Sequence, residues 1–464
     1  SPPGRLHSTA FVSVRRGSVC SIWVCLIACG GSDSRGDGDE GGLLSISDGT
    51  GQNADDGTSG ASATSGASGA SGAEGATIDD DSDSGPKFDL GTPPDGGPVG
   101  PCGGNGAGPS CDFSYIWIAN SSQNTISKIN TQTMVEEGRY RVRPDGGGSP
   151  SRTSVNTAGD VAVASRNGGI TKFHARVESC VDQNGDGVIQ TSMGAADVLE
   201  WGDEECRAWH TPFPAFNTQR PVAWTQGQFN PATCSYENQK VWTAGGMSNS
   251  PGTARVYRLD GDDGSIEADI VVPEISMGTF GPYGAAVNSN GDLWFINYDT
   301  PRRLVHVDYD TLDYTVFDVP ANECSYGFTV DSKDRPWIGT FCGSGTLRFT
   351  PGANTFDAVP GVFGYGIQED ASGTMWLATF SPPGLQAIDA DTLAVGQHIA
   401  LPTSSSRGVS VDFEGYVWFV DMTNSAFKVD TTAGTFETYN QLVGPYTYSD
   451  MTGWGLCNVT VPPG

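Results

Sequence analysis

Apolar and polar positions alternate in a unit that recurs along the second half of the chain. In Gly408–Asp421, GVSVDFEGYVWFVD, an alternating run is followed by a short polar turn and a strongly apolar run around Trp418. Alternation with a period of two predicts a half-buried strand, and the turn predicts that two strands pair as a hairpin. Further copies begin at Gly284, Gly327 and Gly366, and each places a Trp ten residues later, at Trp294, Trp337 and Trp376. The chain therefore repeats one β-hairpin at a fixed register.

Weaker copies of the unit lie upstream. They carry Trp117 and Trp242 at the tryptophan position, and Ala162 replaces Trp in RTSVNTAGDVAVAS. Seven copies at spacings near forty residues, each with short apolar segments, are typical of a β-propeller. The copies with Ala162 and Trp242 lie much farther apart than the others, which indicates an insertion at about 176–225. We therefore predict an all-β fold, a seven-bladed β-propeller over residues 112–460.

The two ends of this region complement each other. Trp117 belongs to a blade with no inner strand before it, whereas MTGWGLCNV at Met451–Val459 follows the last complete blade. Gly453 matches the first glycine of the repeated unit. We therefore expect Gly453–Val459 to supply the inner strand of blade 1, so that the ring closes without an open sheet edge.

The N-terminal quarter of the chain has a different composition. Arg15 and Arg16 precede a short apolar stretch ending in LIAC, which resembles the lipobox of bacterial lipoproteins. The resemblance implies that residues 1–28 are a signal peptide and that Cys29 is lipidated; the alternative is an ordinary cleaved signal. Residues 29–111 are rich in Gly, Ser and Asp, which predicts a disordered acidic tether. The expected location is the bacterial cell envelope, at the outer membrane or its periplasmic face, with the lipid anchor as the only membrane contact.

The charge balance narrows the range of partners. The chain has 54 Asp and Glu against 25 Lys and Arg, a formal net charge of −29. A surface with this charge repels phosphate backbones, which argues against a nucleic-acid partner. We expect a monomer.

Cysteine usage agrees with export. Of the 11 cysteines, eight follow Cys29, and an even number in an exported chain indicates disulfides. Cys180 with Cys206 and Cys324 with Cys342 are the predicted local pairs. The pairing of the others is left open by the sequence: Cys102, Cys111, Cys234 and Cys457.

The repeat, with NTISKIN and GGITKFH as third strands, resembles the streptogramin (virginiamycin B) lyase-like β-propellers over about residues 112–460. The resemblance implies a seven-bladed propeller. In the true lyases it implies a catalytic His and Glu after the Trp-Phe strands, with a magnesium ion. Those positions read WFINYDT, WIGTFCG, WLATFSP and WFVDMTN in this chain, without His or Glu. The lyase chemistry therefore does not carry over, and no catalytic residue is predicted.

An EF-hand-like segment, CVDQNGDGVIQ, lies in the insertion. The candidate calcium ligands at loop positions 1, 3, 5 and 7 are Asp182, Asn184, Asp186 and the carbonyl of Val188. Position 12 is Met193 rather than the usual bidentate Glu. A carboxylate from Asp203, Glu204 or Glu205, drawn back by the Cys180–Cys206 bridge, would have to complete the site. We expect structural Ca²⁺, and the alternative is an Asx-rich turn without metal.

Tyrosine and arginine recur at the start of the predicted inner strands. The residues expected to meet at one end of the central channel are Tyr283, Tyr326, Tyr365, Arg407, Arg152 and Arg220. Amphipathic rings with cationic donors suit a small molecule, a glycan or a peptide. The alternative is that the tyrosines only plug the channel.

Two functions remain open. The first is a lipid-anchored ligand-binding or interaction scaffold. The second is a lyase or hydrolase acting at the channel mouth, with Glu323, Glu369 or Asp370 as the acid. A His or carboxylate with a shifted pKa inside the channel favours the enzyme, whereas a channel of Tyr, Arg and Gly favours binding. Propellers host both functions, so the fold does not decide between them.

Overall fold

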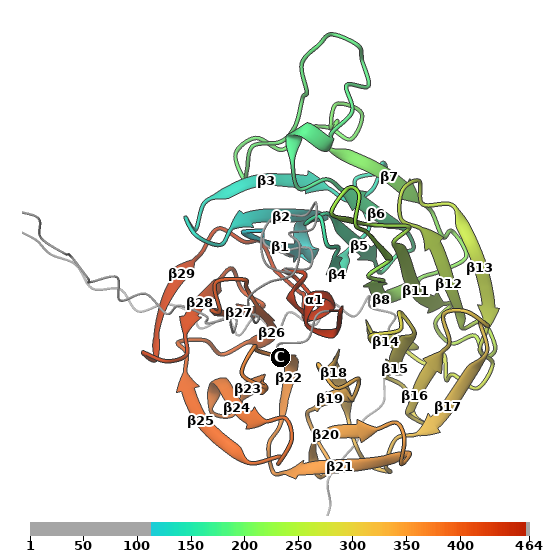
Figure 1. Cartoon of the computed structure of the whole chain (residues 1–464), viewed down its shortest axis with the longest axis vertical. Helices are drawn as coiled ribbons and strands as arrows, with labels where there is room; N and C mark the ends of the chain where they lie inside the picture. Colours follow the sequence, from blue (N-terminus) through green and yellow to red (C-terminus); the bar gives the residue numbers. More distant parts are fainter. Residues whose placement is uncertain (1–112, 461–464) are drawn as a thin grey trace, which may run out of the picture. The chain divides into compact units, whose positions relative to one another are not determined.

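The computed structural model describes residues 113–460. Seven antiparallel sheets are arranged around a centre as the blades of a propeller, which confirms the predicted all-β fold (Figure 1). The predicted signal peptide, Cys29 and the tether lie outside the described residues. None of the helices in the described part is long and apolar enough to cross a bilayer.

Blades 1 to 3 are the less regular part of the ring. Blade 1 has β1 (Tyr115–Asn120), β2 (Thr125–Asn130) and β3 (Glu136–Arg141). Blade 2 has β4 (Pro150–Val155), β5 (Val161–Ser165), β6 (Ile170–Phe173) and β7 (Arg207–Thr211). Blade 3 has β8 (Thr218–Trp224), β11 (Lys240–Gly246), β12 (Arg255–Asp260) and β13 (Ile266–Val271), with a side hairpin of β9 (Gln228–Asn230) and β10 (Ser235–Glu237).

Blades 4 to 7 follow the repeated unit closely. Blade 4 has β14 (Pro282–Val287), β15 (Leu293–Asn297), β16 (Arg303–Val307) and β17 (Tyr314–Asp318). Blade 5 has β18 (Ser325–Val330), β19 (Pro336–Thr340), β20 (Gly345–Thr350) and β21 (Thr355–Pro360). Blade 6 has β22 (Gly364–Glu369), β23 (Thr374–Phe380), β24 (Pro383–Asp389) and β25 (Val395–Ala400). Blade 7 has β26 (Ser406–Val411), β27 (Val417–Asp421), β28 (Ala426–Asp430) and β29 (Thr435–Tyr439), and a helix, α1 (Trp454–Thr460), follows it.

The tryptophan of the repeated unit fixes both the turn of its own blade and the packing between blades. In blades 5, 6 and 7 its indole N–H donates to the Asp that begins the turn, and the distances from Trp337, Trp376 and Trp418 are 2.8, 2.7 and 2.7 Å. Trp117 donates instead to the carbonyl of Gly159 in the next blade, at 3.1 Å. A large ring with a satisfied donor suits the wedge between two sheets.

The ring closes through the C-terminal segment, but not through the residues expected. The N–H of Tyr446 donates to the Ala119 carbonyl at 3.0 Å, and the N–H of Trp117 donates to the Met451 carbonyl at 2.8 Å. Residues 445–451 therefore run antiparallel beside β1 and stand where the inner strand of blade 1 is missing. The prediction for Gly453–Val459 is wrong, because this stretch leads into α1, which lies at the centre of the ring (Figure 1).

The physical reason lies in Asp450. Its carboxylate accepts the N–H of Gly453 at 2.9 Å and that of Leu456 at 3.1 Å, so Asp450 caps a helix start. Gly453 has a φ of 83°, which belongs to the turn before the helix and not to a strand. Gly453, which was matched to the first glycine of the repeated unit, therefore precedes a helix and does not open a strand.

The closing segment also bonds to the blades on both sides. Ser449 accepts the backbone N–H of Thr153 in blade 2 through its hydroxyl, at 2.9 Å, and donates to the carbonyl of the same residue at 2.6 Å. In blade 7, Ser410 accepts the N–H of Met451 at 3.2 Å. The join thus holds the first, second and last blades together.

The extra chain in blade 2 is residues 174–206, between β6 and β7, and it projects from the edge of the ring (Figure 1). It is shorter than the predicted 176–225, because residues 207–211 and 218–224 form β7 and β8. The predicted disulfides Cys180–Cys206 and Cys324–Cys342 are present, with Cα–Cα distances of 4.5 and 5.0 Å. Cys234 and Cys457 are disulfide-bonded as well.

Candidate functional site

The six Tyr and Arg residues predicted for the channel mouth come together from six different blades. The rings of Tyr283 and Tyr326 lie 5.2 Å apart, and those of Tyr326 and Tyr365 lie 4.6 Å apart. The guanidinium carbons of Arg152 and Arg220 lie 5.1 and 5.3 Å from the Tyr283 ring. Arg407 lies 4.5 Å from the Tyr365 ring. These residues, together with those of the next paragraph, are called the mouth cluster below.

Three members of the mouth cluster were missed from the sequence: Tyr446, Tyr448 and Arg166. The ring of Tyr448 lies 4.9 Å from that of Tyr326 and 3.2 Å from the guanidinium carbon of Arg152. The Tyr446 hydroxyl is hydrogen-bonded to those of Tyr283, at 3.0 Å, and Tyr326. Arg166 stacks on the Tyr446 ring at 4.3 Å.

A sequence signal for Tyr448 existed. Met451 is bonded to Trp117 in blade 1, and Ala286 is the strand partner of Trp294 in blade 4. Tyr448 precedes Met451 by three residues, as Tyr283 precedes Ala286. The wrong register for the closing strand hid this correspondence.

Aromatic residues stand at the ends of the second strands of blades 4, 5 and 6: Tyr298 and Phe341 directly after β15 and β19, and Phe380 as the last residue of β23. Tyr298 lies 4.9 Å from Tyr283, Phe341 lies 5.9 Å from Tyr326, and Phe380 lies 5.1 Å from Tyr365, measured between ring centroids. These are the positions that were read for the lyase His and Glu, and they carry aromatic rings instead. They widen the mouth cluster into an aromatic rim.

The mouth cluster has a buried layer and a half-exposed layer. Tyr283, Tyr326, Tyr448, Arg152 and Arg220 are buried, so these residues do plug the channel. Half-exposed members are Tyr365, Tyr446, Arg166 and Arg407. The buried layer therefore acts as packing in the channel, and the half-exposed layer remains the candidate for ligand contact.

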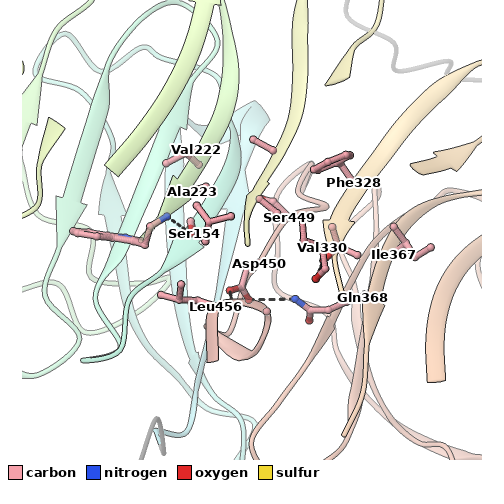
Figure 2. Close-up of a pocket in the computed structure, with 16 residues that line it drawn as sticks. Ser154, Val222, Ala223, Phe328, Val330, Ile367, Gln368, Ser449, Asp450 and Leu456 are labelled. Atoms are coloured by element: carbon pink, nitrogen blue, oxygen red, sulfur yellow. Dashed lines mark hydrogen bonds between the residues drawn. The ribbon is translucent and has the colours of Figure 1, made fainter. Parts of the chain in front are cut away.

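Beneath the buried layer the channel is almost filled. A cavity of about 30 Å³ remains between the inner strands, Ser449, Asp450 and the start of α1 (Figure 2). Figure 2 shows Gln368 directed at Asp450, at a nitrogen–oxygen distance of 3.4 Å. A space of this size holds one or two water molecules at most. A ligand of the channel would therefore reach it at the mouth cluster.

The electrostatics of the mouth cluster are set by its arginines. Burial lowers the pKa of Arg152, and burial followed by the charge of Arg220 lowers that of Arg166. Burial would raise the pKa of Tyr446, but the charge of Arg166 and the hydrogen bonds with Tyr283 and Tyr326 outweigh it and hold that pKa below its usual 10. Tyr446 thus ionises more easily than Tyr283, Tyr326 and Tyr448, whose pKa values are raised by burial.

The histidines of the described blades lie outside the mouth cluster. His306 is on β16, where its Nε2 lies 3.0 Å from Asp292, and His174 follows β6, where its Nδ1 lies 3.0 Å from Asp160. His210 and His398 are on the outer strands β7 and β25.

The acids considered for catalysis are engaged in the fold. Glu323 accepts the N–H of Ser344 at 2.9 Å, and Asp370 accepts the Trp376 indole. Glu369 accepts the side-chain amide of Asn458 on α1 at 2.7 Å, and burial raises its pKa.

A larger groove, of about 610 Å³, lies where the insertion meets blades 2 and 3. Its side chains include Trp201, Trp209, Arg207, His210 and Glu205. Arg207 stacks on Trp201 at 4.3 Å and donates to its carbonyl. The Arg207 guanidinium is thus already engaged within the insertion.

The EF-hand-like loop is organised around Asp182. One oxygen of its carboxylate accepts the N–H of Gly185 at 2.6 Å and the other that of Gly187 at 2.8 Å. Asp186 accepts the N–H of Val188, and Asn184 accepts that of Asp186, both at 2.9 Å. Across residues 113–460, no group of three or more His, Cys, Asp and Glu converges as a metal site.

Glu205 reaches back into this loop, as one of the three acids expected to do so. Its carboxylate accepts the N–H groups of Gln183 and Gln190 at 2.9 and 2.8 Å, and it is buried. Glu204 turns instead to Ser192, whose N–H it accepts at 2.9 Å. The Cys180–Cys206 bridge lies beside Glu205 at the base of the insertion.

The unusual pKa of Tyr446 gives a direct test of the cluster. Because the phenolate is stabilised, we expect a tyrosine to ionise at lower pH than the others in an absorbance titration at the phenolate band. Tyr446→Phe should remove this first transition, whereas Tyr448→Phe, which removes a phenol with a raised pKa, should leave it in place. An unchanged first transition in Tyr446→Phe would contradict the assignment.

Known proteins resemble the chain in three dimensions more than in sequence. No family model and no curated protein matches the sequence. Among solved structures, virginiamycin B lyase from Staphylococcus aureus matches at 16% identity and a TM-score of 0.44, over 65% of this chain and 87% of the lyase. A streptogramin B lyase matches at 16% and 0.48, over 66% and 87%. AztD from Citrobacter koseri matches at 10% and 0.44, over 72% and 96%. The resemblance to streptogramin lyases that the repeat indicated is thus also found among solved structures. At these identities the similarity concerns the fold alone.

Proposed function

We propose that the protein is an exported, lipid-anchored β-propeller that binds a ligand at the mouth cluster. The observation that carries this proposal is the convergence of Tyr and Arg side chains from all seven blades on one end of the channel. Four of them stay half-exposed, with Phe380 beside them. Rings with phenol and guanidinium donors at one opening suit a small molecule, a glycan or a peptide. Cys29 would tether the propeller to the membrane of the cell envelope.

The groove at the insertion is the competing place for a ligand. It has the larger volume, which would make it the first choice on size alone. Its charged groups, however, are already bound to backbone groups of the insertion: Glu205 accepts loop N–H groups, and Arg207 donates to the Trp201 carbonyl. Arg207 of the groove has only neutral partners too, but it is a single arginine, whereas four arginines with neutral partners meet in the mouth cluster. The mouth cluster therefore offers more unpaired positive charge for a ligand.

A lyase or hydrolase acting at the mouth is the alternative function. It would need a general acid or base within reach of the ligand. The acids named for that role support the fold elsewhere, and the described histidines lie on outer strands or beside them. Burial raises the pKa of Glu369 and of Asp450, the kind of shift that would favour an enzyme. Their carboxylates, however, are bound to Asn458 and to the start of α1, away from the mouth cluster, so the geometry favours binding over catalysis.

We further propose that the insertion binds Ca²⁺ as a structural ion. Asp182, Asn184, Asp186 and the Val188 carbonyl would supply oxygens at alternating positions, and Glu205 would replace the missing carboxylate of position 12. Glu205 is the choice because it is already drawn over the loop. The ion would fix the fold of the insertion and take no part in chemistry.

Ligand binding at the mouth cluster can be tested with a thermal-shift screen of small molecules, sugars and short peptides on the full chain. A compound that raises the melting temperature should bind about tenfold more weakly to Tyr365→Ala, which removes a half-buried ring beside Arg407. The matched control is Trp201→Ala in the groove, which should bind normally. Loss of binding in the Trp201 variant alone would place the ligand in the groove instead.

Calcium binding can be tested by hydrogen exchange of the insertion. In millimolar Ca²⁺ the N–H groups of residues 182–190 should exchange more slowly than in a chelator, because the ion would hold the loop closed. Asp182→Asn and Glu205→Gln should abolish the difference, and Asp197→Asn, an exposed acid of the same insertion, should keep it. Equal exchange with calcium and chelator in the unaltered protein would refute the proposal.

A further inference from the structure

The arginines of the mouth cluster lack counter-charges. Within residues 113–460, none of Arg152, Arg166, Arg220 and Arg407 forms an ion pair with a carboxylate. Their hydrogen bonds go to neutral oxygens: Arg152 to the Tyr448 carbonyl at 3.1 Å, Arg220 to the Thr218 hydroxyl at 2.6 Å, Arg166 to the Ser149 hydroxyl at 2.7 Å and Arg407 to the Ser406 carbonyl at 2.7 Å. Four cations thus meet in one place without an anion.

This lack of counter-charge is local. The chain has more than twice as many acids as bases, and most described arginines outside the mouth cluster are paired, such as Arg139 with Glu136 at 2.7 Å and Arg335 with Asp331 at 2.7 Å. The exceptions, Arg176, Arg207 and Arg302, do not lie together, whereas the four unpaired arginines of the mouth cluster do. The acids near the mouth cluster do not neutralise its arginines, because their carboxylates are bound to backbone N–H groups. Asp299 accepts those of Thr279 and Gly281, at 2.9 and 2.6 Å.

Burial of these unpaired charges destabilises the folded protein. Arg152 is 1% exposed and Arg220 is 6% exposed. The Nε atoms of Arg152, Arg220 and Arg407 and the hydroxyl of Tyr448 have no hydrogen-bond partner among the described residues. A buried polar group without a partner destabilises the folded state, and a buried charge without a counter-ion destabilises it more. Tyrosine rings stacked on the guanidinium groups offset part of this cost.

We propose that the ligand of the mouth cluster is a small organic anion, with a carboxylate or phosphate group and a flat or apolar body. This inference rests on the proposed function and names the chemistry of its ligand. The half-exposed Arg166 and Arg407 bind the oxyanion, because guanidinium groups bind carboxylate and phosphate oxygens through paired N–H donors. Tyr365 and the exposed ring of Phe380 receive the body of the ligand.

The strongly negative remainder of the protein does not prevent this. Salt screens charges beyond a distance of about 8 Å at physiological ionic strength, so distant surface acids act weakly on an anion seated among the arginines. They slow the approach of highly charged anions and favour small ones. A nucleic-acid strand, whose charges extend over the acidic surface, stays excluded.

Calorimetry on the full chain in a low-chloride buffer tests the proposal with four probes: benzoate, phenyl phosphate, inorganic phosphate and neutral benzamide. Benzoate or phenyl phosphate should bind with a stoichiometry of one, inorganic phosphate more weakly and benzamide at least tenfold more weakly. Arg166→Gln and Arg407→Gln should each raise the dissociation constant about tenfold, with the unliganded melting temperature as the check on folding. The control Arg255→Gln, an exposed residue paired with Asp269 on the outer part of blade 3, should bind normally.

Each result decides one point. Binding of only benzoate or only phenyl phosphate supports the proposal and identifies the oxyanion. Benzamide bound as tightly as benzoate, with the Arg variants unchanged, overturns the anionic ligand but leaves ligand binding at the mouth cluster intact. Failure of both aromatic anions to bind at millimolar concentration overturns the anionic ligand too, and the screen with Tyr365→Ala then judges the proposed function separately.

Discussion

A circle of sheets must join its last blade to its first, and in this protein a single short segment makes that join. Residues 445–451 supply the missing inner edge of blade 1, and their side chains bond to blades 2 and 7. Without them β1 would present an open edge toward the channel, a template for pairing with another chain. The same segment continues into α1, which fills the far end of the channel. The same C-terminal segment therefore both closes the ring and fills the channel.

This join also creates the mouth cluster. Tyr446 and Tyr448 belong to the closing segment, and Tyr448 stacks on Arg152 while Tyr446 bonds to two other tyrosines. Tyr448 of the closing segment contacts Arg152 of blade 2 and the tyrosines of blades 4 and 5, so closure joins groups from opposite parts of the ring. A cluster built from every blade is rigid, and rigidity keeps several positive charges near one another. Such a preorganised site loses little further freedom when it receives a ligand.

Much of the fold could be predicted from the sequence, because the repeat is a physical requirement of each blade. Trp337, Trp376 and Trp418 must fill wedges and need an acceptor, so Asp and Trp recur at a fixed spacing. The six mouth residues could be predicted for the same reason, since a constant register places them at one end. The start of α1 could not, because a glycine before a helix and a glycine opening a strand look alike without their partners. Because the closing strand was placed at Gly453–Val459 and not at residues 445–451, Tyr448 was not recognised as a member of the mouth cluster. Arg166 lies outside the repeated positions, and only the packed structure brings it to Tyr446.

Hydrogen exchange of the full chain tests closure of the ring most directly. The N–H of Trp117, bonded to Met451, and that of Tyr446, bonded to Ala119, should be protected as strongly as the inner-strand amides of blades 4 to 7. If both exchange as fast as exposed loop amides while blades 4 to 7 stay protected, residues 445–451 do not close the ring, and the mouth cluster that depends on them does not form.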